Sequence, residues 1–116
     1  MPFINFNNIP HQRIWDGVHG ALQHSDELTF GHIILEKGAI VGEHHHIHEQ
    51  WTHVLEGEPE FTLGGETQIM TPGITAHIPS DVPHSALALT RVKVMDCFRP
   101  VREDFKSLEP WTNSQE

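Results

Sequence analysis

Short runs of alternating apolar and polar residues dominate the chain and predict β-strands. Residues 28–37 form one such run, with apolar residues on both faces, as expected for a strand that is covered on both sides. Residues 13–23 permit a short edge strand, and further strand-like runs lie at 51–55, 61–63, 67–70, 74–78, 85–89 and 91–98. Because no run has the apolar period of a helix, the pattern favours an all-β sandwich or barrel.

Glycine and proline residues separate these runs. The pair Gly64-Gly65 can supply the positive φ angles of a two-residue hairpin, and Pro72-Gly73 marks the next turn. Residues 1–12 are predicted to form an arm whose apolar residues pack on a neighbouring subunit or across the edge of the barrel: Phe3, Ile4, Phe6 and Ile9. The polar tail, residues 100–116, predicts one short helical turn or disorder.

Length and charge narrow the classes of protein. A chain of 116 residues suits one domain, 1–116, and its net charge of −9 argues against nucleic acid or an anionic membrane as a partner. The single cysteine, Cys97, permits no intrachain disulfide. The N-terminus lacks the features of a signal peptide, and no apolar run has membrane-spanning length. We therefore expect a soluble, cytoplasmic protein.

Histidines cluster within residues 38–57, GAIVGEHHHIHEQWTHVLEG, which hold five of the eleven histidines in the chain. Along an extended strand His44 and His46 point the same way and His45 points the other way. Two imidazoles on one face can share a transition metal ion, because imidazole nitrogen is a good ligand for such ions. His48 has the same parity, so it is a third ligand, a partner of a ligand, or a histidine at the rim of the site.

The spacing of this stretch resembles the first signature of the cupin family. The matching positions are Gly38, His44, His46, Gln50 and Gly57, with glutamine where glutamate is usual. Residues 73–88 resemble the second signature through Gly73, Pro79 and His84, whereas Asp81 replaces its usual second glycine and Ala88 its terminal asparagine. The resemblance implies a single-domain, jelly-roll-like β-barrel with an N-terminal arm, in which three histidines and a fourth ligand hold one metal ion.

By this resemblance the metal ligands are His44, His46, His84 and the amide oxygen of Gln50. Glu49 is the rival for the fourth position, although an adjacent strand residue would point away from the site. The expected cofactor is one divalent transition metal ion such as Zn, Ni, Fe or Mn. A neutral ligand set would leave the charge of the ion uncompensated, which would make the ion a stronger Lewis acid.

Residues 92–98 predict a strand with one acidic residue on its inner face. Parity places Asp96 on the same face as Val92, Val94 and Phe98, which is the natural inner face. A carboxyl group among apolar side chains near a metal is a candidate general acid or base. The alternative is a buried aspartate that bonds a neighbouring strand or a metal-bound histidine.

A narrower resemblance is to the pectin-degradation cupins that open the ring of 4,5-unsaturated uronates. It rests on the run from His44 to Gln50, on His84, and on the pattern Asp96-x-Phe98-x-x-x-Arg102. It implies that Asp96 transfers a proton and Arg102 holds a sugar acid, the product feeding uronate catabolism. Phe98 and Trp51 are predicted as apolar walls of the substrate site, with ordinary core or interface packing as the alternative for Trp51.

Three other functions stay open for such a chain. Three histidines and open coordination positions also suit an iron dioxygenase, and the barrel could instead bind or sense a small ligand without converting it. A storage or structural role is the third, although nothing in such a role calls for the paired motifs. By analogy, and from the apolar arm, a homodimer is expected.

Overall fold

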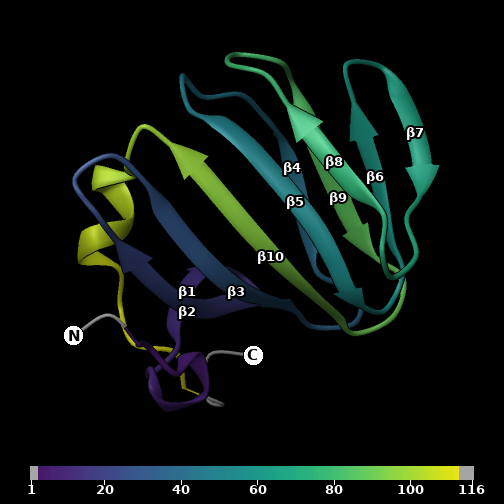
Figure 1. Cartoon of the computed structure of the whole chain (residues 1–116). Coiled ribbons are helices and arrows are strands. Elements are labelled where there is room, and N and C mark those ends of the chain that lie inside the picture. The colour runs from purple at the N-terminus through teal and green to yellow at the C-terminus, as the bar shows by residue number, and fades with distance from the viewer. Residues whose placement is uncertain (1–2, 113–116) are drawn as a thin grey trace.

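Two antiparallel sheets face each other in the computed structural model, which describes residues 3–112 (Figure 1). The larger sheet has the order β1-β2-β3-β10-β5-β8 and the smaller one β4-β9-β6-β7. The strands are β1 (Gln12–Trp15), β2 (Val18–His24), β3 (Thr29–Leu35), β4 (Ile40–His44), β5 (Glu49–Glu56), β6 (Pro59–Leu63), β7 (Glu66–Ile69), β8 (Thr75–Ile78), β9 (His84–Ala88) and β10 (Val92–Arg99). The all-β prediction is confirmed. No helix in the described part is long and apolar enough to cross a membrane.

Most predicted strands are present, but two features were not predicted. The run 13–23 is a hairpin of β1 and β2, which turns at Asp16-Gly17 with Gly17 at a φ of 71°. Strand β4 was missed because its sequence, IVGEH, has no regular apolar alternation. Most of this strand is exposed, so no apolar face was needed. The predicted two-residue hairpin is confirmed, since Leu63 pairs with Glu66 across Gly64-Gly65.

The core lies between the two sheets. β10 is a central strand of the larger sheet. β10 pairs with β3 on one side and with β5 on the other. Its inward residues Val92, Val94, Asp96 and Phe98 are only 1%, 4%, 7% and 3% exposed, which confirms the inner face predicted from parity. This strand therefore carries a carboxyl group into the interior, next to three apolar side chains on the same face.

Backbone conformation explains two positions of the motifs. Gly57 has a φ of 84°, and a Cβ atom there would lie 2.2 Å from the carbonyl oxygen of Arg91, so only glycine fits. Asp81, at the usual place of a glycine, has a φ of 64°, a left-handed conformation that aspartate tolerates better than most residues. Its N–H donates to the carbonyl oxygen of His46 at 2.8 Å and so joins the two motifs.

The N-terminal arm lies on the outer face of the larger sheet. Phe6, in a short 3₁₀ turn η1 (Phe6–Asn8), stacks on His32 of β3 with ring centroids 4.6 Å apart. Phe3 and Ile4 are 90% and 53% exposed. Packing on the chain's own sheet thus explains the apolar residue Phe6. Packing of the arm on a second subunit stays a prediction. Residues 1–2 lie outside the described part.

The C-terminal segment forms the short helical turn that the sequence predicted. This turn is η2 (Glu103–Ser107), in which Phe105 is buried. The alternative of disorder falls partly on residues 113–116, which lie outside the described part.

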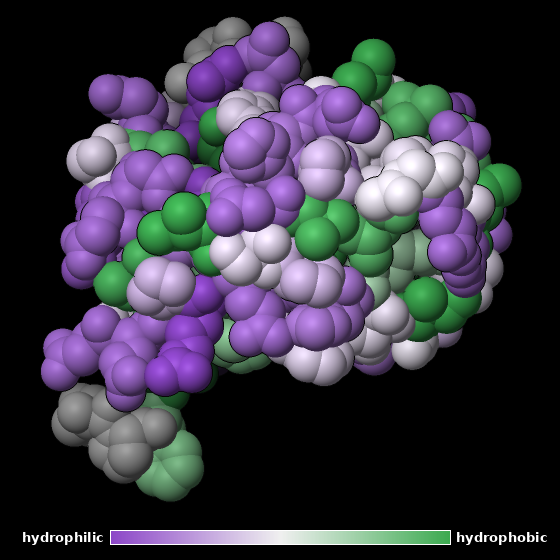
Figure 2. Space-filling model, turned by 90° about the horizontal axis from the view of Figure 1, so that it is seen from above, coloured by the Kyte–Doolittle hydropathy of each residue, from purple (hydrophilic) through white to green (hydrophobic). Residues whose placement is uncertain are grey.

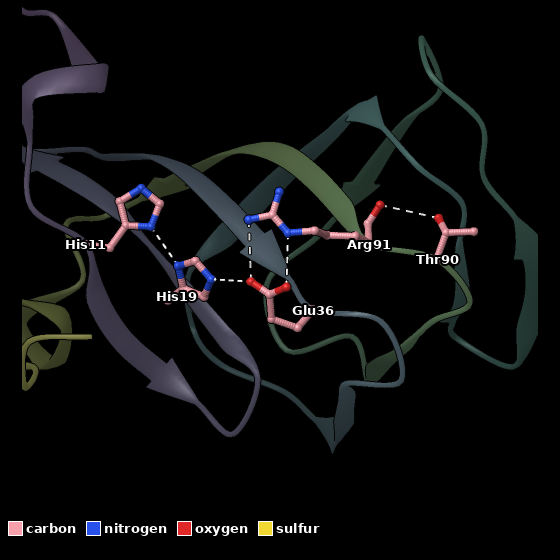
Figure 3. A network of polar contacts seen from close by, with 5 residues as sticks. All are labelled: His11, His19, Glu36, Thr90 and Arg91. Carbon is pink, nitrogen blue, oxygen red and sulfur yellow. Dashed lines mark hydrogen bonds and ion pairs between the residues drawn. The ribbon is translucent and has the colours of Figure 1, made fainter. Parts of the chain in front are cut away.

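A buried histidine of β2, His19, contacts residues near both ends of the described chain; Figure 3 shows its contacts with His11 and Glu36. The ring of His19 lies 2.6 Å from Nδ1 of His11 and 2.6 Å from Oε2 of Glu36. Trp111 stacks on the same ring at 4.2 Å. Arg91 donates to Glu36 at 3.0 Å, and the hydrogen bonds from His19 and Arg91 outweigh the effect of burial and lower the pKa of Glu36.

His19→Ala should lower the free energy of unfolding of the metal-free protein by about 2 kcal/mol or more, because it removes a packed ring and leaves polar partners unsatisfied. Urea denaturation in EDTA measures this loss. His45→Ala is the control, since His45 is exposed and has only a 3.4 Å contact with Asp81. Equal unfolding midpoints for both variants would contradict the structural role of His19.

Candidate functional site

Three histidines converge at one end of the sandwich. His44 ends β4, His46 follows it in the β4–β5 loop, and His84 begins β9, where it pairs directly with His44. One ligand atom from each residue lies within 4.8 Å of the others. Figure 2 looks onto this end and shows hydrophilic residues with hydrophobic ones interspersed. The two motifs are thus joined in space at this cluster.

Backbone carbonyl groups fix how each ring is protonated. Nδ1 lies 2.8 Å from the Gly42 oxygen in His44, 2.9 Å from the His48 oxygen in His46, and 2.9 Å from the Val82 oxygen in His84. A carbonyl oxygen only accepts, so each Nδ1 carries the hydrogen and donates it. In the neutral rings every Nε2 then keeps a lone pair, which is the atom that can bind a metal.

Burial favours the neutral form of two of these rings, His46 and His84. It lowers the pKa of His84 to about 4 and also lowers the pKa of His46, and the positive charge of Arg102 acts in the same direction. Nε2 of His84 is buried and has no hydrogen-bond partner. An unsatisfied lone pair in this position is costly unless a ligand or ion meets it.

The side chain of Gln50 points into the cluster and that of Glu49 does not. The Gln50 amide nitrogen donates to Oγ1 of Thr52 at 2.8 Å, and its oxygen lies 3.0 Å from Nε2 of His46. With Nδ1 of His46 protonated, both facing atoms are acceptors, and a bound cation is the species that satisfies both. Glu49 instead meets His77 at 2.6 Å on the outer surface. This donor set fits a divalent transition metal ion.

His48 stays outside the three-histidine cluster. Its ring meets that of His46 edge-on at 5.4 Å, and its buried Nδ1 has no hydrogen-bond partner. Burial lowers the pKa of His48, which favours the neutral form of this ring. The structure thus places His48 next to the cluster, as a neighbour of His46.

Asp96 is buried across from Thr52 on the paired strands β5 and β10. Burial raises its pKa to about 7, although a hydrogen bond from Thr52 and the charge of Arg102 oppose this rise. One carboxyl oxygen, Oδ1, is buried and has no hydrogen-bond partner. A carboxyl group in this state can both give and accept a proton near neutral pH.

Arg102 is held against two aromatic rings. Its guanidinium group lies 3.9 Å from the ring centroid of Phe105 and 4.8 Å from that of Phe98. Nε and Nη2 donate to Asp104 at 3.1 and 2.8 Å, and the hydrogen bonds from Arg102 lower the pKa of that carboxyl group. Arg102 is therefore a fixed cation, only 9% exposed.

One cavity brings most of the predicted residues together. Among its lining residues are His44, Gln50, His84, Asp96, Phe98 and Arg102. Trp51 is not among them: it is 48% exposed and stacks on His77 at 4.2 Å, because its neighbours Gln50 and Thr52 face inward. The structure does not support Trp51 as a wall of the substrate site, and strand alternation is the physical reason.

Sequence reasoning missed three residues of this site. Thr52, Phe105 and Trp15 also line the cavity, and Trp15 meets the ring of His44 edge-on at 4.9 Å. Parity with Gln50 was the signal that could have identified Thr52. No sequence pattern places Trp15 or Phe105 here, since both reach the cavity from distant segments.

The comparisons with known proteins agree with this arrangement. The family model described as a cupin domain matches residues 31–98, and this chain belongs to the cupin family. No match to a curated protein sequence is found.

Among the similar solved structures are two that are more than 25% identical to this chain. An RmlC-like cupin from Shewanella frigidimarina is 30% identical, with 90% of this chain and 96% of that chain covered and a TM-score of 0.85. KdgF from Halomonas sp. is 28% identical, with 90% and 98% covered and a TM-score of 0.84. A predicted oxalate decarboxylase from Thermotoga maritima, 20% identical with 84% and 98% covered and a TM-score of 0.76, shares the fold.

The raised pKa of Asp96 predicts how stability depends on pH. Between its ordinary pKa of 3.8 and about 7, the folded state keeps a proton that the unfolded state releases, so stability falls as pH rises through this window. Between pH 4 and pH 7, the free energy of unfolding of the metal-free wild type should fall by up to about 4 kcal/mol relative to that of Asp96→Asn. Urea denaturation in EDTA at several pH values measures the difference, and parallel pH profiles would contradict it.

Proposed function

We propose that this protein is a metal-dependent enzyme that opens the ring of 4,5-unsaturated uronate monosaccharides to a linear keto-deoxy sugar acid. The observation that carries the proposal is Asp96, a buried acid with one unpartnered carboxyl oxygen, which lines the same cavity as His44, His84 and Arg102. The similarity to KdgF supports the resemblance to the pectin-degradation cupins.

The metal ligands in this proposal are Nε2 of His44, His46 and His84 and Oε1 of Gln50. When bound, the ion supplies Lewis acidity toward a substrate oxygen, and no protein carboxylate in the ligand set offsets its charge. The fixed Nδ1–H groups of the three histidines keep their ligand atoms turned toward one another. The donor set suits Zn, Ni, Fe or Mn.

Arg102 binds the carboxylate of the sugar acid. Two of its nitrogen atoms, Nε and Nη2, are engaged by Asp104, which leaves the hydrogens of Nη1 for a ligand. The two aromatic rings hold the guanidinium plane, so little side-chain entropy is lost on binding. Phe98, on the same inward face as Asp96, provides an apolar wall.

Asp96 moves the proton that the reaction needs. Ring opening is an isomerisation: the anomeric hydroxyl gives its proton to Asp96, the bond between the anomeric carbon and the ring oxygen breaks, and an aldehyde and an enolate form. Protonation of the enolate carbon by Asp96 then gives the ketone, so atoms balance without another reactant. A carboxyl group with a pKa of about 7 can take the first proton and deliver the second.

The proposed ligand set makes a prediction about metal content. His46→Ala should lower the affinity for Zn²⁺ or Ni²⁺ at least about 100-fold, because a direct ligand is worth more than an outer partner of a ligand. Competition with a chelator measures the affinity, and metal analysis gives the ions bound per chain. His45→Ala, one residue away but exposed, serves as the matched control and should bind like the wild type. Full occupancy in His46→Ala would remove this histidine from the ligand set.

The proposed reaction is tested by the ultraviolet absorbance of a 4,5-unsaturated galacturonate, which decays as the ring opens. The metal-loaded protein should accelerate the decay, and Asp96→Asn should reduce the rate about 10² to 10⁴-fold while it still binds metal, because it removes the proton carrier.

Undiminished turnover by Asp96→Asn would remove this residue from the mechanism. No acceleration by a fully metallated wild-type protein would reject the uronate reaction, and oxygen uptake by the iron-loaded protein would then test for a dioxygenase. Ligand binding without turnover would instead indicate a sensor.

A further inference from the structure

The buried hydroxyl group of Thr52 connects Gln50, at the histidine cluster, with Asp96. Thr52, only 5% exposed, accepts a hydrogen bond from the Gln50 amide nitrogen at 2.8 Å and lies directly opposite Asp96 on the paired strand, where its hydroxyl lowers the pKa of that carboxyl group by hydrogen bonding. We infer that Thr52 is a positioning residue that turns the oxygen of Gln50 toward the metal and fixes which oxygen of Asp96 faces the cavity. This inference rests on the proposed function, since it takes Gln50 as a metal ligand.

Strand pairing brings these groups together on one face. Thr52 lies two residues after Gln50 on β5, and the partners of these residues on β10 are Asp96 and Phe98. Residues two apart on a strand, and residues directly opposite on a neighbouring strand, point to the same side of a sheet. The three polar side chains therefore meet in the interior, where an unmade hydrogen bond is costly.

The direction of the hydrogen bonds follows from what each group can do. A threonine hydroxyl has one hydrogen to donate, and the Asp96 carboxyl group, once it has lost its proton, only accepts. When Thr52 donates its hydrogen to Asp96, its oxygen can only accept from Gln50, so it must face the amide nitrogen. The amide oxygen is then turned to His46, 3.0 Å away.

The reverse orientation would block the metal site. If the Gln50 amide turned over, its NH₂ group would donate to Nε2 of His46 and occupy the lone pair that a metal ion needs. The two ends of an amide have nearly the same shape, so packing alone discriminates weakly between them. The hydroxyl of Thr52 supplies the discrimination.

The same hydroxyl orients the acid. Thr52 engages the Asp96 carboxyl group, while Oδ1 of that group keeps no partner. The free oxygen is thus available to a bound molecule in the cavity that Asp96 lines. Thr52 touches neither the ion nor the substrate in this scheme, and it acts through the two residues on either side of it.

The experiment compares Thr52→Val, which keeps the shape but loses the hydroxyl, with Thr52→Ser, which keeps the hydroxyl. Chelator competition with Zn²⁺ measures the affinity, and melting in EDTA checks the fold. Thr52→Val should bind Zn²⁺ about 10 to 100-fold more weakly than the wild type, the usual effect of losing an outer partner of a ligand. Thr52→Ser should restore binding to within about threefold. Thr52→Ala takes the place of Thr52→Val if the valine variant does not fold.

Gln50→Glu provides a matched background, because a carboxylate presents an oxygen at either end and needs no orienting. In this background Thr52→Val should weaken Zn²⁺ binding much less than in the wild type. Equal losses in both backgrounds, or no loss from Thr52→Val in the wild type, would overturn the inference.

Gln50→Ala separates this inference from the proposed function. If Gln50→Ala weakens Zn²⁺ binding and Thr52→Val does not, the positioning role fails while the ligand set stands. If Gln50→Ala leaves the affinity unchanged, the ligand set itself fails, and the role of Thr52 fails with it. Because every measurement is of metal affinity, absence of uronate turnover would reject the reaction and leave the positioning role standing.

Discussion

Burial of polar groups inside an apolar sandwich is the constraint on which this site depends. Each such group must find a partner or carry a large free-energy cost. Gln50 and Thr52 satisfy each other, and Arg102 is satisfied by Asp104 and two aromatic rings. Nε2 of His84, Oδ1 of Asp96 and Nδ1 of His48 are buried without a partner. His84 and Asp96 line the cavity, so their unsatisfied atoms mark where the fold leaves room for an ion and a ligand.

One buried cation dominates the electrostatics of the cavity, although the chain as a whole has a net charge of −9. Among the described residues that line the cavity, Arg102 is the one with a permanent positive charge. Its charge reaches the other groups of the site: it lowers the pKa values of His46 and His84 and opposes the rise in the pKa of Asp96. One immobilised cation in a low-dielectric interior can attract an anionic molecule that the molecular surface would otherwise repel.

Strand alternation made part of this site predictable from the sequence. It gave the inner face of β10 and the choice of Gln50 over Glu49 as the inward residue. Applied consistently, it also excludes Trp51, which lies between two inward residues. His44 and His46 also converge, but His46 lies in the loop after β4, so strand alternation is not the cause. Alternation fails for β4, which is mostly exposed, and for Arg102, whose position is set by packing on Phe105 after the strand has ended. Residues placed by tertiary contacts alone leave no periodic trace in a sequence.

The proposed ligands do not all come from one sheet. His44 and His84 belong to paired strands of the smaller sheet, forty residues apart in the chain, whereas Gln50 belongs to the larger sheet. An ion held by all of them would tie the two layers together at one rim. Neither half of the chain could bind it in this way alone, so occupancy would report on assembly of the whole sandwich. The ion would then cross-link the two sheets in addition to its proposed part in catalysis.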